Sequence, residues 1–192
     1  LAAGSSSRFG SPKLLAPLAG RPVLQHVLDA LAAAGVDDVA VVLGDEKAAI
    51  EAAIAWRAER RVTNERPADG LSSSLRVGLD AAAEDAGADA VLVVLGDQPA
   101  LRPEAIRRVV EAAEASPALF VRARHAVDGA PNPVLVRRAA WAMAAGLSGD
   151  RGLGPLLAER PELVLEVPVE GASPDVDTPG DLATLEVNEG ER

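Results

Sequence analysis

The chain has 192 residues, no cysteine and a formal net charge of −10, with aromatic side chains at only 2%. This length allows one domain with a sizeable core, and the lack of cysteine excludes a disulfide framework and a thiolate zinc site. The acidic balance and scarce aromatic residues argue against a nucleic-acid partner, which would require basic patches and stacking side chains. No apolar run approaches the ~20 residues of a membrane span and no signal peptide is recognisable, so we expect a cytoplasmic protein with no membrane partner.

Patterns typical of helices and strands alternate along the first 122 residues. A helix is predicted from Arg21 to the stop signal Gly35, because Pro22 suits a first helical turn and apolar residues recur at helical spacing. Residues 90–95 form the strongest predicted strand, since their continuous branched apolar character suits burial on both faces. The other predictions are a strand over 39–43, helices over 48–60, 71–84 and 103–115, an extended segment over 61–64 and a strand over 119–122. This alternation predicts α/β architecture with right-handed crossovers.

The pattern changes in the last third of the chain. Residues 125–136 contain two prolines and indicate a hairpin or an irregular excursion. Helices are predicted over 137–145 and 152–159, and a strand over 163–167. A final helix should start at Pro179 with Thr178 as its cap, and residues 186–192 are expected to be a frayed tail.

The opening stretch, residues 1–15, is a loop of small residues bracketed by Gly4 and Gly10, with Arg8 inside it and Lys13 directly after it. Glycines allow a ligand to approach closely, successive N–H groups can point at phosphate oxygens, and two cations offset phosphate charge. A solvated turn is the alternative, and the spacing matches neither a P-loop nor G-x-G-x-x-G. The chain has only two lysines and one lies beside this loop, which favours phosphate binding over a plain turn.

Two acidic segments are candidate ligand sites. Asp97 directly follows the most buried predicted strand, where ligands of open α/β sheets collect, so we expect a binding role rather than only a turn cap. The second segment, 173–182, contains Asp175 and Asp177, and by itself it indicates the capped start of a helix. Magnesium takes one or two carboxylates together with phosphates and waters, so Asp97 and one carboxylate of this segment could form a magnesium site.

The run LAAGSSSRFGSPKLL at residues 1–15 resembles the signature loop of the MobA-like nucleotidyltransferases, roughly LxAGxSxRxGxxK. Three later segments also resemble elements of that family: GDQP at 96–99, N…GxxxSL over 64–75 and DVDTPGDL at 175–182. The branch that the chain resembles most is molybdenum cofactor cytidylyltransferase. The resemblance implies a single three-layer α/β/α domain over 1–192, Rossmann-like and of the GT-A type, with a mostly parallel sheet. Since the chain opens inside the motif, we also expect an apolar first strand to be missing before Leu1.

The resemblance further implies a triphosphate substrate, CTP, and a magnesium cofactor bound by Asp97 and Asp177, with Asp175 a weaker candidate. Arg8, Lys13 and Asp97 would be the catalytic residues, and the two cations would stabilise the departing pyrophosphate. From the residues alone, the serines of 72–74 could equally form a plain helix cap. The nucleotide-binding residues that the resemblance implies are Leu1, Ala2, Ala3, Gly4, Ser5, Ser6, Arg8, Lys13, Asn64, Ser74 and Asp97.

For the second substrate, the resemblance implies a molybdopterin-type cofactor, with a molybdoenzyme as a protein partner. Gln98, Asn132 and Asp150 are expected to contact this acceptor. Asn132 departs from the cytidylyltransferase relatives, which tend to carry His there, and the turn at Asp150 could simply cap a helix. A phosphate monoester is already an oxyanion near neutral pH, so its attack on an α-phosphorus needs positioning and charge stabilisation rather than a general base.

Three other functions are compatible with these residues. The chain could transfer a nucleotidyl group to a different phosphorylated acceptor. It could be an NAD(P)-linked oxidoreductase, as some relatives that resemble this family are, although G-x-G-x-x-G is absent. It could also be a non-catalytic protein that handles the cofactor and docks on a molybdoenzyme. Pyrophosphate release would separate the transferase from the binding protein, and NAD(P)H consumption would identify the oxidoreductase.

Overall fold

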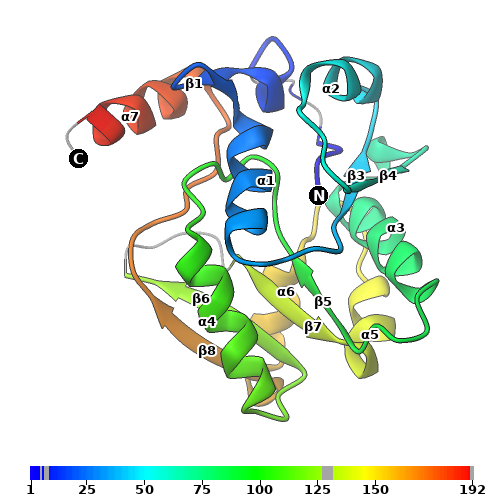
Figure 1. The fold of residues 1–192 in the computed structure, drawn as a ribbon. Coiled ribbons are helices and arrows are strands. Elements are labelled where there is room, and N and C mark those ends of the chain that lie inside the picture. The colour runs from blue at the N-terminus through cyan, green and yellow to red at the C-terminus, as the bar shows by residue number, and fades with distance from the viewer. Residues whose placement is uncertain (5, 7–8, 127–131, 191–192) are drawn as a thin grey trace.

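A sheet lies between two layers of helices in the computed structural model, which describes residues 1–4, 6, 9–126 and 132–190 (Figure 1). One face is covered by α1 (Val23–Ala33) and α4 (Pro103–Glu114), and the other by α3 (Leu71–Ala83), α5 (Trp141–Ala145) and α6 (Leu153–Glu159). This is the three-layer α/β/α arrangement that the sequence predicted. None of the helices in the described ranges is long and apolar enough to cross a membrane.

Two ladders of strands are joined by the first two residues of the chain. β3 (Ala40–Leu43) pairs in parallel with β4 (Arg60–Thr63). The second ladder has the spatial order β5 (Ala90–Val93), β7 (Val134–Arg137), β6 (Phe120–His125) and β8 (Val164–Val169). Between the ladders, the Ala2 amide donates to Val42 O and the Gly96 amide donates to Leu1 O, both at 2.8 Å. Among these described strands only β7 runs antiparallel, because it returns from β6 as a hairpin, so the sheet is mostly parallel as predicted.

Side chains along the central strands point alternately to the two faces of the sheet, so one strand contributes to the hydrophobic core on each side. On β7, Val134 and Val136 pack with α3, α5 and α6, while Leu135 between them packs with α4 on the other face. Phe120 and Val121 of β6 divide in the same way, and both are fully buried. Successive side chains of a strand point to opposite faces, so the buried apolar residues of β6 and β7 contribute to the helical layers on both sides.

Several predicted boundaries differ from the observed ones. The helix predicted over 48–60 is α2 (Lys47–Ala53), which ends early because Ile54 turns into an extended conformation and is buried in the core. The next amide, of Ala55, donates to the Gln25 side chain on α1 at 2.9 Å instead of continuing the helix. The predicted 137–145 helix is split into η3 (Arg138–Ala140) and α5. The predicted hairpin over 125–136 agrees with the β6–β7 pairing, and its residues 127–131 lie outside the described part.

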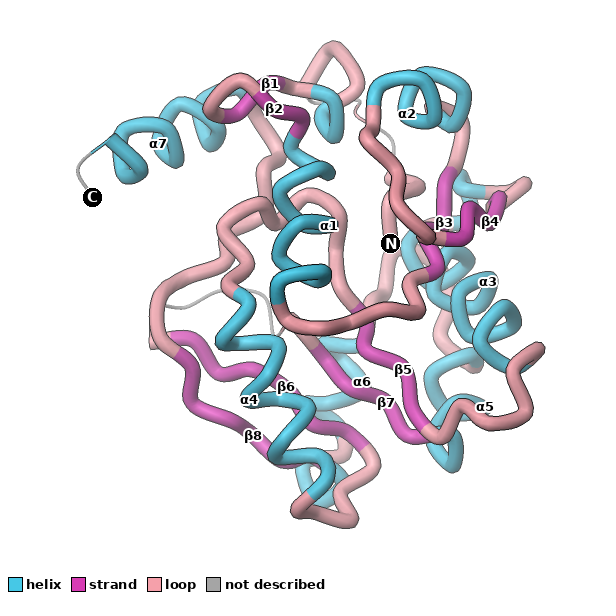
Figure 2. The backbone as a smooth tube through the Cα atoms, in the orientation of Figure 1, coloured by secondary structure: helices cyan, strands magenta, loops and turns pink. Residues whose placement is uncertain are grey.

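A two-stranded hairpin that the sequence did not reveal precedes α1. It pairs β1 (Pro17–Leu18) with β2 (Arg21–Pro22), and its turn residues Ala19 and Gly20 have φ of 47° and 77°. Figure 2 shows this hairpin beside α7 (Pro179–Gly190), with which β1 is in contact. Positive φ at both central positions is the geometry of a tight hairpin turn, but Ala carries no sequence signal for it.

The last helix begins where it was predicted and continues further than expected. Thr178 Oγ1 accepts the amide of Asp181 at 3.3 Å, and the Asp181 carboxylate accepts the Thr178 amide at 2.7 Å, so each residue caps the other. α7 then runs to Gly190, so the expectation of a frayed tail from 186 was wrong as far as 190. The physical reason is that Leu182 and Leu185 pack against the core beside α1 and hold the helix in place.

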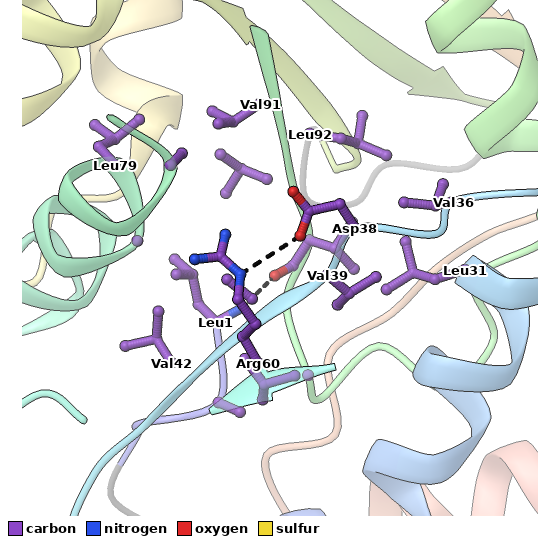
Figure 3. A pocket seen from close by; sticks show the side chains of 18 of the residues that line it. Leu1, Leu31, Val36, Asp38, Val39, Val42, Arg60, Leu79, Val91 and Leu92 are labelled. Carbon is purple, nitrogen blue, oxygen red and sulfur yellow. Dashed lines mark hydrogen bonds and ion pairs between the residues drawn. The ribbon is translucent and has the colours of Figure 1, made fainter. Parts of the chain in front are cut away.

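An apolar cavity of about 350 Å³ lies between β3 and β5, next to Leu1 (Figure 3). Leu31 and Val39 line one side, while Leu79 and Val91 line another. Asp38 and Arg60 lie at its edge and form an ion pair with an N–O distance of 3.5 Å (Figure 3), and Asp85 also belongs to the lining. Most of the lining is apolar, so this cavity offers mainly hydrophobic contact. The predicted strand before Leu1 remains a prediction.

Candidate active site

The ammonium group of Lys13 lies between two carboxylates that are far apart in the sequence. Its Nζ atom is 2.6 Å from Asp97 Oδ2 and 2.9 Å from Asp177 Oδ1. Lys13 begins the short helix η1 (Lys13–Leu15) after the opening loop, Asp97 follows β5, and Asp177 precedes α7. Three residues that the sequence singled out therefore meet at one point, at the carboxyl end of a central strand, where open α/β sheets bind their ligands.

Backbone contacts hold the three elements together. The Val176 amide donates to Asp97 O at 2.8 Å, which joins the segment before α7 to the loop after β5. The Lys13 amide donates to Ser6 Oγ at 2.9 Å, and Ser6 Oγ in turn donates to Glu46 Oε2 at 3.1 Å. The opening loop is thereby tied to the segment that follows β3. Ser5 and Arg8, which the resemblance implied, lie outside the described residues.

The cluster holds one positive and two negative charges, and they differ in exposure: the Asp177 side chain is 43% exposed, that of Asp97 20% and that of Lys13 10%. Lys13 is 8% exposed, and its burial would lower the pKa of its ammonium, but Asp97 and Asp177 together outweigh that effect and raise the pKa. The ammonium therefore stays protonated. Asp97 Oδ1 is buried and finds no hydrogen-bond partner among the described residues. A buried carboxylate oxygen without a donor is costly, so it marks a place that a further cation or donor would fill.

Gln98 and Asp175 form a second polar contact behind the carboxylates. Gln98 is completely buried, and its Nε2 donates to Asp175 Oδ1 at 2.7 Å. Burial raises the pKa of Asp175, and the negative charges of Asp97 and Asp177 act in the same direction against the Gln98 hydrogen bond. Because the Gln98 side chain has no exposed surface, it is placed to orient Asp175 rather than to contact a second substrate directly.

The carboxylate pair fits a divalent metal ion. Both oxygens already lie within hydrogen-bond distance of a single cationic nitrogen, and Asp97 keeps one oxygen unpaired among the described residues. The described residues contain no group of three or more acidic or His side chains in metal-binding geometry. Two carboxylates are nevertheless what magnesium usually takes from a protein when phosphates and waters complete its shell. Asp97 and Asp177 are therefore the residues that would hold such an ion.

The predicted nucleotide loop over 64–75 is held by its own side chains. Asn64 is buried, and its Nδ2 donates to Ser73 Oγ at 2.8 Å and to Ser74 Oγ at 3.0 Å, while its Oδ1 accepts the Arg66 amide at 2.9 Å. These bonds use both N–H groups of Nδ2 and one of the two acceptor positions of Oδ1. Asn64 and Ser74 are therefore placed to fix the shape of the loop and of the start of α3.

The three residues expected to contact the acceptor lie in different surroundings. Gln98 is in the interior beside Asp175. Asn132 is buried near the end of the β6–β7 connection, and its main-chain carbonyl accepts a hydrogen bond from His125 Nε2 at 2.8 Å. Asp150 is exposed in a turn that packs against Gly70. Lys13, Asp97 and Asp177 are thus in direct contact, whereas the three residues expected to contact the acceptor lie in separate surroundings.

A hollow of about 380 Å³ lies between the opening loop and the segment after β3. Its walls include the backbone of Gly4 and Gly10 on one side and Asp45 and Glu46 on the other. Ala3 packs so closely on Gly44 that a Cβ there would lie 2.9 Å from Ala3 O. Glu46 was not predicted from the sequence; the one available signal was its position just after the end of a buried strand.

A model of one protein family matches residues 1–164, and its description is the MobA-like NTP transferase domain. The chain belongs to this family. This is the family that the motif of the opening loop resembles.

Two curated proteins are similar to this MobA-like chain along part of their length. The bifunctional protein GlmU of Desulfitobacterium hafniense is 30% identical over 177 residues, which are 91% of this chain and 34% of that relative. The 2-C-methyl-D-erythritol 4-phosphate cytidylyltransferase of Cereibacter sphaeroides is 39% identical over 120 residues, 61% of this chain and 53% of the relative. The chain thus spans about a third to a half of the length of these two proteins.

Solved structures resemble the MobA-like protein along nearly its whole length. A crystal structure of Rv0371c from Mycobacterium tuberculosis H37Rv superposes with a TM-score of 0.85 at 33% identity, covering 97% of this chain and 94% of the other. A second structure of the same protein, in complex with manganese, has a TM-score of 0.82 at 31% identity, covering 96% and 94%. The fold is therefore shared with a protein that binds a divalent metal.

Proposed function

We propose that this MobA-like nucleotidyltransferase transfers CMP from CTP to a phosphate monoester, a molybdopterin-type cofactor, and releases pyrophosphate. The observation that carries the proposal is the contact of Lys13 with Asp97 and Asp177 at the end of the opening loop. One cation and two carboxylates at this position suit the binding of a triphosphate together with a divalent ion.

The chain's own groups have distinct tasks in this reaction. An acceptor phosphate oxygen forms a bond to the α-phosphorus of CTP while the bond from that phosphorus to the pyrophosphate oxygen breaks. The acceptor is already an oxyanion, so no side chain has to remove a proton. Lys13 stabilises the charge that collects on the departing pyrophosphate, and Arg8 is proposed to assist it. Backbone groups of Leu1, Ala2, Ala3, Gly4, Ser5 and Ser6 are proposed to hold the base, the ribose and the phosphates.

Asp97 and Asp177 are proposed to hold magnesium, which when bound neutralises phosphate charge and polarises the P–O bonds. Asp97 also shares its carboxylate with Lys13, so its second oxygen remains available for this purpose in the described part of the site. Asn64 and Ser74 are proposed to shape the nucleotide loop, and Gln98 to orient Asp175. Asn132 and Asp150 are proposed to face the acceptor from the β6–β7 connection and from the turn before α6.

The choice of CTP rests on the Ala2-Ala3-Gly4 form of the opening loop and on a relative that is named a cytidylyltransferase. The choice of acceptor rests on the similarity of the whole motif set to molybdenum cofactor cytidylyltransferases. A molybdoenzyme that receives the product, and a cytoplasmic location, complete the proposal. Asn132 favours a second candidate, transfer to a different phosphorylated acceptor, because it replaces the His that is usual in the cytidylyl branch.

Pyrophosphate release tests the proposal directly. The protein is incubated with magnesium, one of CTP, GTP, ATP or UTP, and either molybdopterin-type cofactor or a sugar phosphate. We expect release only with CTP and the molybdopterin-type cofactor. Release with a sugar phosphate alone would establish the second candidate, and a preference for GTP would contradict the assignment of the base.

The same assay tests the two carboxylates. Asp97→Asn is expected to lower turnover by about 100-fold or more, as is usual when a group that stabilises transition-state charge is removed. Asp177→Asn is expected to act in the same direction. Asp37→Asn, at an exposed carboxylate in the loop after α1, is the matched control and should leave turnover unchanged. Full activity of Asp97→Asn would remove this carboxylate from the mechanism.

A further inference from the structure

Lys13 occupies the place between the two carboxylates where a metal ion would be held. We propose that Lys13 is a built-in competitor for this site: its ammonium pairs with Asp97 and Asp177 until a triphosphate draws it away, so that metal and nucleotide bind cooperatively. The inference deepens the proposed function and rests on it for the identity of the nucleotide. It concerns the metal affinity of the protein rather than its turnover.

The competition follows from the distances. Nζ of Lys13 lies 2.6 Å from Asp97 Oδ2 and 2.9 Å from Asp177 Oδ1, so the ammonium already uses one oxygen of each carboxylate. A divalent ion bound by the same pair would lie close to this positive charge, in a place where the lysine side chain is only 10% exposed. Like charges at such separations repel strongly where water is scarce. Metal binding without nucleotide must therefore either displace the ammonium or remain weak.

The ammonium can leave without a change of the backbone. The Lys13 amide is fixed by Ser6 Oγ and the residue begins η1, so the main chain is anchored, while the side chain bonds only to the two carboxylates among the residues that the structure describes. A lysine carries its charge on a flexible four-carbon stem, so the charge can turn from the carboxylates toward a neighbouring anion. Phosphates bound along the opening loop, directly before Lys13 in the chain, would supply that anion.

Thermodynamic linkage predicts that triphosphate and metal strengthen each other's binding. If the triphosphate removes the ammonium from Asp97 and Asp177, it raises the affinity of this pair for metal, and metal raises the affinity for triphosphate by the same factor. A triphosphate also adds ligands of its own to the metal, so cooperativity in the unmodified protein is not sufficient evidence. The distinctive consequence concerns the protein without nucleotide: removal of the Lys13 charge should strengthen metal binding there.

The experiment measures binding of Mn²⁺ alone to the full chain by the loss of the electron paramagnetic resonance signal of free Mn²⁺. Lys13→Met keeps the length of the side chain and removes its charge, and it is expected to bind Mn²⁺ about tenfold more tightly than the unmodified protein, within the range usual for coupled sites. Lys47→Met is the matched control, because Lys47 is the only other lysine and donates to Thr63 Oγ1 at 2.8 Å, away from the carboxylates. It should not change Mn²⁺ binding.

Two further Mn²⁺-binding measurements test whether the two carboxylates and the nucleotide are involved. In the Lys13→Met, Asp97→Asn double variant the added affinity should disappear; if it persists, Mn²⁺ is bound elsewhere and the inference fails. With the α,β-methylene analogue of CTP, the unmodified protein should bind Mn²⁺ more tightly than without it, and Lys13→Met should gain less. If Lys13→Met does not fold by thermal melting, Lys13→Gln replaces it.

The outcome is separable from that of the proposed function. Equal or weaker Mn²⁺ binding by Lys13→Met without nucleotide would overturn the competition, even if the protein releases pyrophosphate as proposed. Tighter binding by that variant would support the competition, even if the acceptor or the base proved to be different.

Discussion

The backbone of Gly70 lies directly against the backbone of Gly149. A Cβ atom on Gly70 would be 2.4 Å from the Gly149 carbonyl carbon, and the Ser72 amide donates to Gly149 O at 3.2 Å. This contact joins the proposed nucleotide loop to the turn that carries Asp150. The two sides of the proposed site are therefore coupled through the main chain, although they are about eighty residues apart in the sequence.

Gly70→Ala should consequently disturb both sides at once. Gly70 has φ +90° and ψ −178°, a conformation that is essentially restricted to glycine, so we expect a loss of about 1–3 kcal/mol in the free energy of unfolding. The KM for the triphosphate and the KM for the acceptor should both rise. Urea unfolding and steady-state kinetics measure these effects. Gly154→Ala, inside α6 with open space around it, is the control and should be neutral or slightly stabilising. A normal Gly70→Ala protein would contradict the close approach.

The Asn64 side chain is predicted to be a structural part of the nucleotide loop. Asn64→Ala removes three hydrogen bonds from a buried position and leaves the Arg66 amide and two hydroxyls to find other partners. We expect a loss of about 1–3 kcal/mol in unfolding free energy and a higher KM for the triphosphate. Glu65→Ala, at the exposed neighbouring position, serves as the control. A changed KM with unchanged stability would instead indicate direct contact between Asn64 and the nucleotide.

Gln98 is predicted to act on stability through Asp175. Gln98→Met has a similar volume but no amide, so it leaves the Asp175 carboxylate without this donor. We expect the free energy of unfolding to fall by about 1–3 kcal/mol, measured with urea. Asp175→Asn retains an oxygen that can accept from Gln98 and should be much less harmful. If the two variants are equally destabilised, the hydrogen bond is not what keeps Gln98 in the interior.

A pH-dependent contribution is predicted for Asp29 on α1. Burial would raise the pKa of Asp29, but hydrogen bonds from Arg57 and Gln25 and the charges of Arg57 and Arg21 outweigh it and lower the pKa. A carboxylate whose pKa is lowered on folding adds stability above the ordinary value of about 3.9 and loses it as the pH falls through the folded pKa. Asp29→Asn should therefore cost at most about 1 kcal/mol at neutral pH, since the pair is partly exposed.

The difference between Asp29→Asn and the unmodified protein should be smaller at about pH 2 than at neutral pH, because Asp29 becomes protonated as the pH falls through its lowered folded pKa. Urea unfolding at the two pH values measures it. An Arg57→Gln background provides the double-mutant cycle, in which the effect of Asp29→Asn at neutral pH should be smaller. A cost that is the same at both pH values would show that packing, and not charge, makes the contribution.

Local patterns sufficed to predict much of this protein. The order of helices and strands, the buried central strand before Asp97 and the capped start of α7 depend on residues close together in the chain, so periodicity and capping chemistry reveal them. The early end of α2 was missed because a contact from Gln25, thirty residues away, decides it. The turn at Ala19 was missed because no residue there is typical of positive φ.

The sequence by itself determined which chemical groups are available: a lysine beside a loop of small residues and carboxylates after a buried strand and before a last helix. Only the tertiary structure decided how they are used. Lys13 meets Asp97 and Asp177 across 84 and 164 positions of chain, and Gln98 meets Asp175 across 77. Such contacts depend on how the sheet and helices pack, so no local pattern encodes that a lysine should lie between these two carboxylates or that a glutamine should be buried beside them.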